Sequence, residues 1–487
     1  MKRYLLVMVM VVLTGTVFAQ GAGDALRYSQ TYYMGTARFM ATGGSFGALG
    51  ADLSLASTNP AGLGLFRLNK FSITPMFNTS NTQSIYNGVT ATDSKFDMSL
   101  GNLGYVRATK IDNNSGWKYL QLAVGMNKLN DFHTNLNMQG PNATNSRLDV
   151  YLQNADGINY NDIATNKNNA YSYYLQPAWD LYLIDTIPGY NNLYYSPVPY
   201  GGTYQSDQHV VTGSVNQWYV SAAANYNNVV YIGATLGINS LNYNRDSYYS
   251  ETDIADTIPY FNSWELDQSL QTIGTGIDLK LGIIIQPNKW LRIGAAFHTP
   301  TWYYSMTDTW QTKTYADLGW VSPSSVKSPI GTYNYSLTTP MKFIGDIGIL
   351  IGNRGSVSLE YENINYSTMK LNAPDYNFKT ENNNIKNYYK STNNLRLGTE
   401  WRFGLMDIRA GYAYYGSPYS NGYNDGSRVA ISGGLGFHLS NYTIDMAYVH
   451  SVQKQDYYFY GTNNISVNPV NNTFKNNRFA ISISYRF

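Results

Sequence analysis

The sequence ends in RFAISISYRF, residues 478–487, and this stretch indicates the fold class. One face of the extended chain carries all of its large apolar side chains, which are Phe479, Ile481, Ile483, Tyr485 and Phe487. The other face carries only Arg, Ala and Ser. Alternation with a period of two is typical of a β-strand whose two faces meet different surroundings. A soluble β-sandwich contains such strands too, so the rest of the chain must decide between a sandwich and a transmembrane barrel.

Fourteen segments in all show this alternation, and their charged residues lie almost always on the face opposite the large apolar ones. Asp278 and Lys280, for example, alternate with Ile277, Leu279 and Leu281. A transmembrane barrel needs this arrangement, with lipid outside and a polar lumen inside. The predicted strands are 70–80, 95–107, 117–127, 215–226, 229–242, 266–286, 290–311, 332–351, 355–369, 388–403, 406–416, 427–439, 441–456 and 474–487.

The connections between these strands alternate in length, as in a barrel with short periplasmic turns and long outer loops. Long connections are predicted at 81–94, 128–214, 243–265, 312–331, 370–387, 417–426 and 457–473. A soluble propeller or repeat array is the rival, but no fixed repeat period is evident. The predicted fold is therefore all-β, a transmembrane antiparallel β-barrel of about fourteen strands.

The composition excludes several other classes. Only 13% of the 487 residues are charged, the net charge is +2, and there are 46 Tyr, 43 Gly and no Cys. Without Cys there is no disulfide framework, thiolate metal site or cysteine nucleophile. The balanced charge leaves no basic surface for nucleic acid. No apolar run of ~18 residues follows the N-terminus, so a bundle of membrane helices is excluded as well.

Residues 1–19 are typical of a secretory signal peptide. Lys2 and Arg3 precede an apolar run at 4–13, and Val17 and Ala19 supply the small residues of a cleavage site. The alternative is a buried N-terminal strand. We expect cleavage after Ala19, which would place the mature chain outside the cytoplasm.

Residues 20–69 precede the first predicted strand and are dense in Gly and Ala. Small residues permit close packing of backbones, and Asn59-Pro60 favours a turn. Composition alone leaves two interpretations. One is a compact piece inside the lumen, and the other is a periplasmic linker or small domain.

This segment resembles the N-terminal signature of the long-chain fatty acid transporter (FadL/TodX-type) family of outer-membrane proteins. The matching residues form two groups, Gly35, Ala37, Arg38, Ala41, Gly43 and Gly44, then Ala56, Asn59, Pro60, Ala61 and Gly62. Two further similar stretches, 274–300 and 395–414, follow in family order. The strand that ends at Phe487 resembles the C-terminal signal of bacterial outer-membrane barrels, which implies the barrel assembly machinery as a partner.

The resemblance implies a barrel (70–487) plugged by an N-terminal hatch (20–69) in the outer membrane of a Gram-negative bacterium. In the family, outer loops capture a hydrophobic ligand, which moves to a pocket above the hatch and is thought to leave sideways at a kinked strand. The hatch motif would be Gly35, Arg38, Gly43, Gly44, Asn59, Pro60, Ala61 and Gly62. Passive uptake of long-chain fatty acids is the first expectation, and of aromatic hydrocarbons the second.

No motif indicates catalysis, a metal or a cofactor, so none is predicted. The five histidines have no metal-ligand spacing, and no nucleophile motif is present. The inward-facing charges favour a network that packs the barrel against the hatch. The alternative is that Arg292 or Arg409 binds a ligand carboxylate. His298, on a lumen face, is a further candidate ligand contact.

The longest predicted loop, 128–214, contains the run YSYYLQPAWDLYLI at 171–184. Its apolar positions fit a short amphipathic helix about as well as a strand. Loops this long are usually functional or folded locally. Tyr174 and Trp179 are therefore candidate ligand contacts in an outer lid, and an ordinary surface loop is the alternative.

Three other functions fit such a barrel: a partner in protein secretion or surface attachment, a barrel enzyme, and an open porin. An apolar pocket beneath the loops would favour uptake. A shallow polar loop surface without an enclosed pocket would favour the partner role. A Ser or His beside a carboxylate at the lumen mouth would favour an enzyme. A 20–69 segment outside the lumen would contradict gating.

Overall fold

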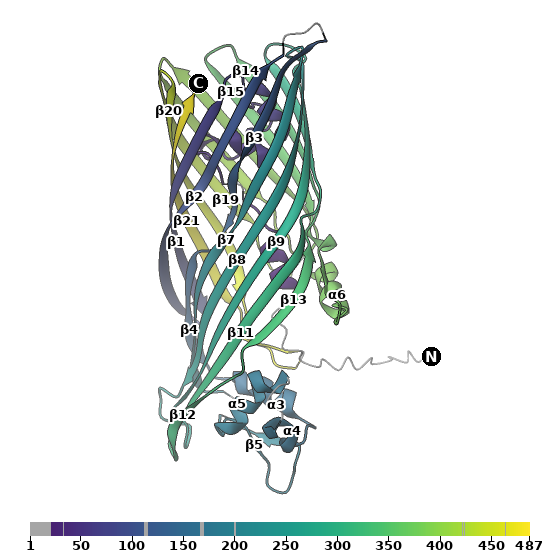
Figure 1. Ribbon diagram of the computed structural model, residues 1–487. Coiled ribbons are helices and arrows are strands. Elements are labelled where there is room, and N and C mark those ends of the chain that lie inside the picture. Colours follow the sequence, from purple (N-terminus) through teal and green to yellow (C-terminus); the bar gives the residue numbers. More distant parts are fainter. Residues whose placement is uncertain are drawn as a thin grey trace, which may run out of the picture.

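The computed structural model describes residues 21–32, 34–111, 115–165, 170–198, 201–420, 422, 424–462 and 464–487. They form a closed barrel of 14 antiparallel strands (Figure 1). The barrel closes where β1 (Lys70–Tyr86) pairs with β21 (Val470–Arg486), from Lys70 opposite Arg486 to Ile85 opposite Asn471. The signal peptide predicted at 1–19 lies outside the described residues.

Ten of the wall strands are continuous and four are broken into two pieces. Besides β1 and β21, the continuous strands are β2 (Val89–Lys110), β7 (Thr203–Tyr226), β8 (Val230–Thr252), β9 (Ser263–Ile285), β17 (Ser391–Phe403), β18 (Met406–Tyr415), β19 (Arg428–Leu439) and β20 (Tyr442–Tyr457). The broken strands are β3 (Trp117–Asp131) with β4 (Thr134–Asn142), β10 (Leu291–His298) with β11 (Trp302–Leu318), β13 (Gly331–Thr338) with β14 (Lys342–Ile351), and β15 (Gly355–Asn365) with β16 (Lys370–Asn372). All fourteen predicted strands are thereby confirmed.

The long connection predicted at 81–94 is wrong, because β1 and β2 continue to a tight turn at Asn87-Gly88. Both turn residues have positive φ, +46° and +86°, which is the requirement of a type I′ hairpin turn. The Asn-Gly pair was the available signal. The connections predicted at 128–214, 243–265 and 312–331 are also shorter than predicted. Strands β4, β7, β8, β9, β11 and β12 (Val321–Lys327) extend into them.

The two faces of the wall differ as expected for a barrel in lipid. Along β9, Ile277, Leu279, Leu281 and Ile283 are each about 40% exposed on the outside, whereas Asp278 and Lys280 are 4% exposed inside. Within the described residues, none of the helices is long and apolar enough to cross a membrane.

Residues 21–69, here called the lumen segment, lie against the inward faces of the strands (Figure 1, purple). The segment contains the helices α1 (Ala22–Ser29) and α2 (Ala37–Ala41) and the 3₁₀ helices η1 (Leu53–Ser57) and η2 (Pro60–Leu65). Its apolar side chains are almost all buried against barrel residues such as Val106, Ala123 and Tyr219. It is therefore not a linker outside the barrel.

Residues 143–202, here called the cap, cover the end of the barrel opposite the C-terminus (Figure 1). The cap contains α3 (Arg147–Ala155), α4 (Tyr160–Thr165), η3 (Ala170–Tyr173), α5 (Leu175–Asp180), β5 (Asp185–Thr186) and β6 (Tyr194–Tyr195). The ambiguous run at 171–184 thus forms η3 and α5, which makes it helical. A second insertion, η4 (Tyr366–Thr368) to α6 (Lys379–Tyr388), lies beside β13 (Figure 1), and its helix α6 packs directly against α1 of the lumen segment.

Candidate functional site

The lumen segment meets the wall through Asn59. The Asn59 Oδ1 atom accepts the N–H of Ala61 at 3.2 Å and so caps η2, while its Nδ2 donates to Oδ2 of Asp346 on β14 at 2.9 Å. The carbonyl of the preceding Thr58 lies 2.6 Å from Nε2 of His298. Asparagine suits this position because it supplies an acceptor to the helix and a donor to the wall at once.

Glycines on both sides let the backbones of segment and wall touch. A Cβ on Gly411 of β18 would lie 2.1 Å from the nitrogen of Gly43, and one on Gly233 of β8 would lie 2.3 Å from the carbonyl carbon of Pro60. Gly43 also has φ +66°, in the left-handed region that favours glycine. Within the segment, a Cβ on Gly35 would meet Ser54 and one on Gly62 would meet Leu55. The small residues of the motif therefore fit a close contact.

A buried ion-pair network joins the segment to the barrel. Arg38 donates twice to Glu400, over 2.8 and 2.7 Å. Arg409 donates to Glu400 at 2.5 Å, to Asp445 at 2.8 Å and to Asp407 at 2.9 Å. Each of these charges thus has a partner, which offsets the cost of burying it. This is the packing network that the inward-facing charges favoured.

The five residues predicted as ligand contacts are each engaged in contacts within the protein. Arg409 is held by its three carboxylates, Arg292 donates to the Leu49 carbonyl at 2.5 Å, and His298 contacts Thr58. In the cap, the Tyr174 hydroxyl accepts from Gln268 at 2.8 Å, and Trp179 stacks on Tyr160 with ring centres 5.4 Å apart. None of the five lines the cavity that the described residues enclose.

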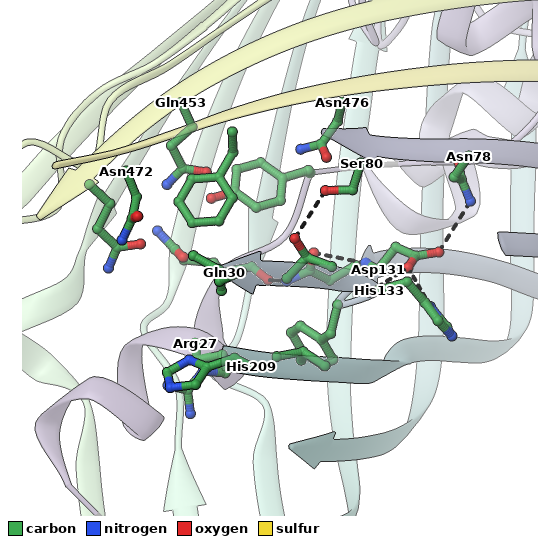
Figure 2. Close-up of a pocket in the computed structure, with 18 of the residues that line it drawn as sticks. Arg27, Gln30, Asn78, Ser80, Asp131, His133, His209, Gln453, Asn472 and Asn476 are labelled. Carbon is green, nitrogen blue, oxygen red and sulfur yellow. Dashed lines mark hydrogen bonds and ion pairs between the residues drawn. The ribbon is translucent and has the colours of Figure 1, made fainter. Parts of the chain in front are cut away.

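That cavity, of about 260 Å³, lies between the lumen segment, through Arg27, Gln30 and Tyr32, and the inward faces of the wall strands (Figure 2). Its lining differs from the apolar pocket expected from the sequence, because charged side chains line it together with apolar ones such as Phe132, Leu136 and Phe474. The charged and imidazole groups are Arg27, Arg245, Arg428, Arg478, Asp97, Asp131, Asp456, His133 and His209.

Three of these arginines have no carboxylate partner among the described residues, namely Arg245, Arg428 and Arg478. Arg428 donates to Oγ of Ser451 at 2.7 Å, and its guanidinium lies 4.1 Å from the ring centre of Tyr32. The Nε atom of Arg478 is buried without a hydrogen-bond partner. A guanidinium in this state can bind an anionic oxygen strongly. The cavity is therefore equipped to hold an acidic group.

The wall beside the cavity is interrupted between β2 and β3. Their backbone ladder runs from Lys110 opposite Tyr119 to Asn102 opposite Asn127 and stops there. Further toward the cap, β3 turns inward and accepts N–H groups of the lumen segment, from Tyr32 to the Leu129 carbonyl at 2.9 Å and from Met34 to the Lys128 carbonyl at 3.2 Å. The β4 strand pairs with β7 alone. We call this break, between 89–101 and 128–142, the seam.

The cap packs against wall residues that line the cavity. Tyr151 of α3 packs on Trp264 and Tyr174, and Leu136 and Met138 of β4 belong to the same apolar cluster. Burial raises the pKa of the Tyr151 and Tyr174 hydroxyls above the usual value for tyrosine. Both rings therefore stay neutral and contribute apolar surface to the lid.

Comparison with known proteins supports this fold at low sequence identity. The Pseudomonas putida toluene transporter TodX matches 93% of this chain and 98% of its own, with TM-score 0.55 and 11% identity. A Pseudomonas aeruginosa FadL homologue gives TM-score 0.54 and 13% identity over 93% and 98%. The Ralstonia pickettii toluene transporter TbuX gives TM-score 0.50 and 14% identity over the same shares.

These matches show the fold alone, a β-barrel of the kind found in FadL- and TodX-type proteins, and at the level of the fold they agree with the resemblance seen in the sequence. No family model matches the chain, and no curated protein matches its sequence.

Proposed function

We propose that this chain is an outer-membrane channel of the FadL type that takes up hydrophobic small molecules passively. The observation that carries the proposal is the cavity between the lumen segment and the wall, placed beside a break in the wall. A ligand would bind under the cap, rest in the cavity and leave sideways. The lumen segment, held by Asn59 and Arg38, would act as the hatch that keeps the rest of the lumen closed.

The proposed exit is the seam, and the outer wall next to it supports this. A depression of about 430 Å³ on the lipid side is lined by Phe71, Leu103, Tyr105, Val124 and Trp218 with their neighbours. Gly104 and Gly125, which are opposite each other in the ladder, also line it. Directly behind both lies the hydroxyl of Tyr219, which is buried and has no hydrogen-bond partner among the described residues.

The cavity favours a ligand with an acidic head and an apolar tail over a plain hydrocarbon. The unpaired guanidinium groups of Arg428 and Arg478 would bind the head, and Phe132, Leu136 and Phe474 would contact the tail. Removing apolar surface from water contributes about 25 cal/mol per Å². A long-chain carboxylic acid combines both features, so it is the proposed ligand class.

Binding to the purified full chain in an amphipol tests the proposal. Palmitic acid should bind saturably, and hexadecanol and toluene more weakly, because only the acid can pair with the arginines. Pro60→Gly is examined beside the wild type, since it loosens the start of η2 at the wall contact. No saturable binding of any alkyl or aromatic ligand would contradict uptake.

A role as an attachment or secretion partner is the second candidate, because large aromatic side chains are exposed on the outer end. Tyr260 is 69% exposed and Trp320 is 55% exposed. Exposed apolar surface of this kind marks interaction sites when it is contiguous. Loss of cell-surface attachment, but not of uptake, on replacing both residues by Ser would favour this role.

A further inference from the structure

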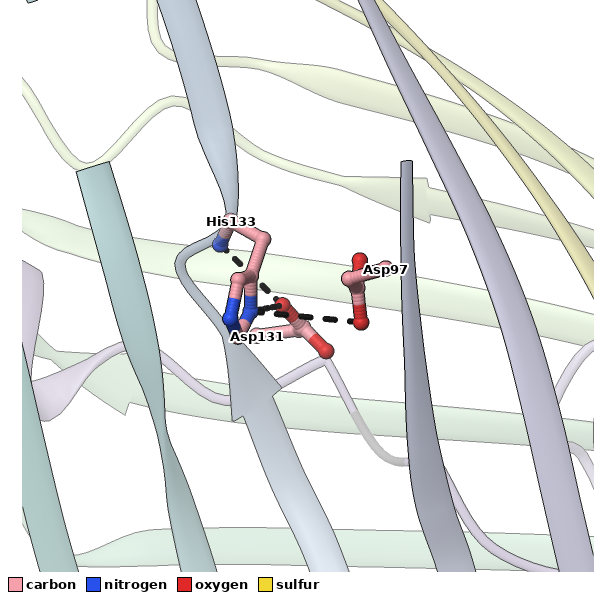
Figure 3. A group of neighbouring side chains, drawn as sticks. All are labelled: Asp97, Asp131 and His133. Atoms are coloured by element: carbon pink, nitrogen blue, oxygen red, sulfur yellow. Dashed lines mark hydrogen bonds and ion pairs between the residues drawn. The ribbon is translucent and has the colours of Figure 1, made fainter. Parts of the chain in front are cut away.

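A cluster of metal-ligating side chains lies at the seam, and neither the fold nor the proposed uptake makes use of it. Asp97 comes from β2, Asp131 from the end of β3, and His133 from the turn between β3 and β4 (Figure 3). The sequence did not reveal it, because Asp97 lies on a different strand from the other two. We infer that these three side chains form a site for a divalent transition-metal ion of the Zn²⁺ kind, which ties β2 to β3 across the seam.

The geometry suits one small ion. Nδ1 of His133 lies 2.7 Å from Oδ1 of Asp131 and 3.9 Å from Oδ2 of Asp97, and the ligand atoms all lie within 4.8 Å of one another. A tetrahedral ion with bonds of about 2.0–2.2 Å separates its ligand atoms by about 3.3–3.6 Å, which falls between the two distances. One imidazole with two carboxylates favours Zn²⁺ over Ca²⁺ or Mg²⁺.

Asn78 supplies an independent sign of a missing ligand. It is 94% buried (6% exposed), and its Nδ2 donates to Oδ2 of Asp97 at 3.0 Å, to Oγ of Ser99 at 3.2 Å and to Oδ2 of Asp131 at 3.3 Å. Its Oδ1 is buried and has no hydrogen-bond partner among the described residues. A half-turn of the amide exchanges the two atoms. Oδ1 would then point between the two carboxylates, which is favourable only with a cation there, so it becomes the fourth ligand.

Two cations, Lys128 and Arg478, lie near the carboxylates, and among the described residues Arg478 forms no ion pair with either Asp97 or Asp131. Lys128 is paired with Oδ2 of Asp131 at 3.1 Å, whereas the proposed site uses Oδ1 of the same carboxylate. Side-chain exposures of 25% for His133, 10% for Asp97 and 4% for Asp131 shield the site without sealing it. All three line the cavity, so an ion can enter from there.

The location gives the ion a structural role. Residues 89–101 of β2 pair with β1 alone, and only side chains join them to β3 and β4, such as Lys95 to Asn135 at 3.3 Å. A metal that binds Asp97 and His133 together would replace the missing backbone ladder by coordinate bonds. The bound ion would hold the seam closed, and loss of the ion would allow β2 and β3 to separate there.

Isothermal titration of the full chain with Zn²⁺ alone, in metal-free detergent, tests the site. We expect one Zn²⁺ per chain, with affinity lowered at least tenfold by Asp97→Asn and by His133→Gln. His209→Gln is the matched control, because His209 also contacts a carboxylate, Asp207 at 3.1 Å, but belongs to no three-residue cluster. It should bind Zn²⁺ like the wild type.

Absence of stoichiometric Zn²⁺ binding would overturn the inference, as would equal binding by all four proteins. Hydrogen exchange tests whether the bound ion stabilises the seam. Zn²⁺ should slow amide exchange in 95–101 but not in β8, and Zn²⁺ binding without this change would overturn the role at the seam. Both readouts are independent of the transported molecule, so they stand apart from the uptake proposal.

Discussion

The lumen has two levels, the contact around the lumen segment and the cavity beside the seam, and arginines are paired in the first but not in the second. Around the lumen segment, Arg38 and Arg409 are saturated by carboxylates, and the wall glycines touch the segment backbone. Around the cavity, Arg428 and Arg478 form no ion pair with a carboxylate in the described part of the chain, and the wall ladder is interrupted at the seam. A paired charge fixes structure and an unpaired one is available to a ligand. The first level therefore stabilises the structure, and the second is available to bind a ligand.

The sharpest contrast between the levels is expected from removing one arginine at each. Arg409→Met leaves Glu400, Asp407 and Asp445 without their shared cation, so it should lower the free energy of unfolding by ~3–5 kcal/mol. Arg478→Met removes a charge that forms no ion pair and should change it by less than ~1 kcal/mol. Urea unfolding in detergent, followed by tryptophan fluorescence, measures both. Equal losses would erase the distinction between the levels.

Glycine substitutions probe the close contact of the first level. Gly411→Ala places a Cβ 2.1 Å from the Gly43 nitrogen and 2.4 Å from the Thr42 carbonyl carbon, both backbone atoms, so stability should fall by ~1–3 kcal/mol. Gly345→Ala is the control, since a Cβ there meets nothing within 4 Å. It should be neutral within ~0.5 kcal/mol. The same unfolding measurement applies, and a tolerant Gly411 would mean that the segment is loosely held.

Ligand selectivity probes the second level. Replacing Arg428 and Arg478 together by Met should weaken palmitic acid binding about tenfold, equivalent to ~1.4 kcal/mol. Binding of hexadecanol should not change, because it makes no ion pair. The ratio of the two dissociation constants, measured by titration in an amphipol, is the readout. An unchanged ratio would show that the two arginines do not bind the carboxylate of the ligand.

The strands could be predicted from the sequence because each one faces lipid on one side and a polar lumen on the other. Prediction failed where this difference disappears. Beyond the lipid belt, β1 runs through NTSNTQS (78–84) and β8 through NRDSYYS (244–250). Both faces are polar or mixed there, so the period of two fades although the backbone ladder continues.

The candidate site was less accessible to prediction. Arg409 and Arg478 both lie on inward faces and look alike in the sequence. They differ because Glu400 is the register partner of Arg409 and Asp445 also reaches it, whereas Arg478 lies opposite Val449. Register between strands far apart in the chain is set by packing and turns. The wall contacts of the lumen segment were easier to predict, because glycine permits close approach of backbones and asparagine caps helices.

One measurement tests the sideways route through the seam most directly. The chain contains no Cys, so a single disulfide can be placed at Asn102 and Asn127, the last ladder pair before the seam, by replacing both with Cys. Gln217 and Asn239, partners in the continuous β7–β8 ladder, provide the matched control pair. Uptake of palmitic acid into liposomes is compared in oxidised and reduced protein.

If ligand leaves through the seam, oxidation of the Asn102–Asn127 pair should reduce uptake at least tenfold and reduction should restore it, while the control pair has no effect. Uptake that is unchanged by the seam disulfide would contradict the account, because the ligand would then pass along the lumen segment.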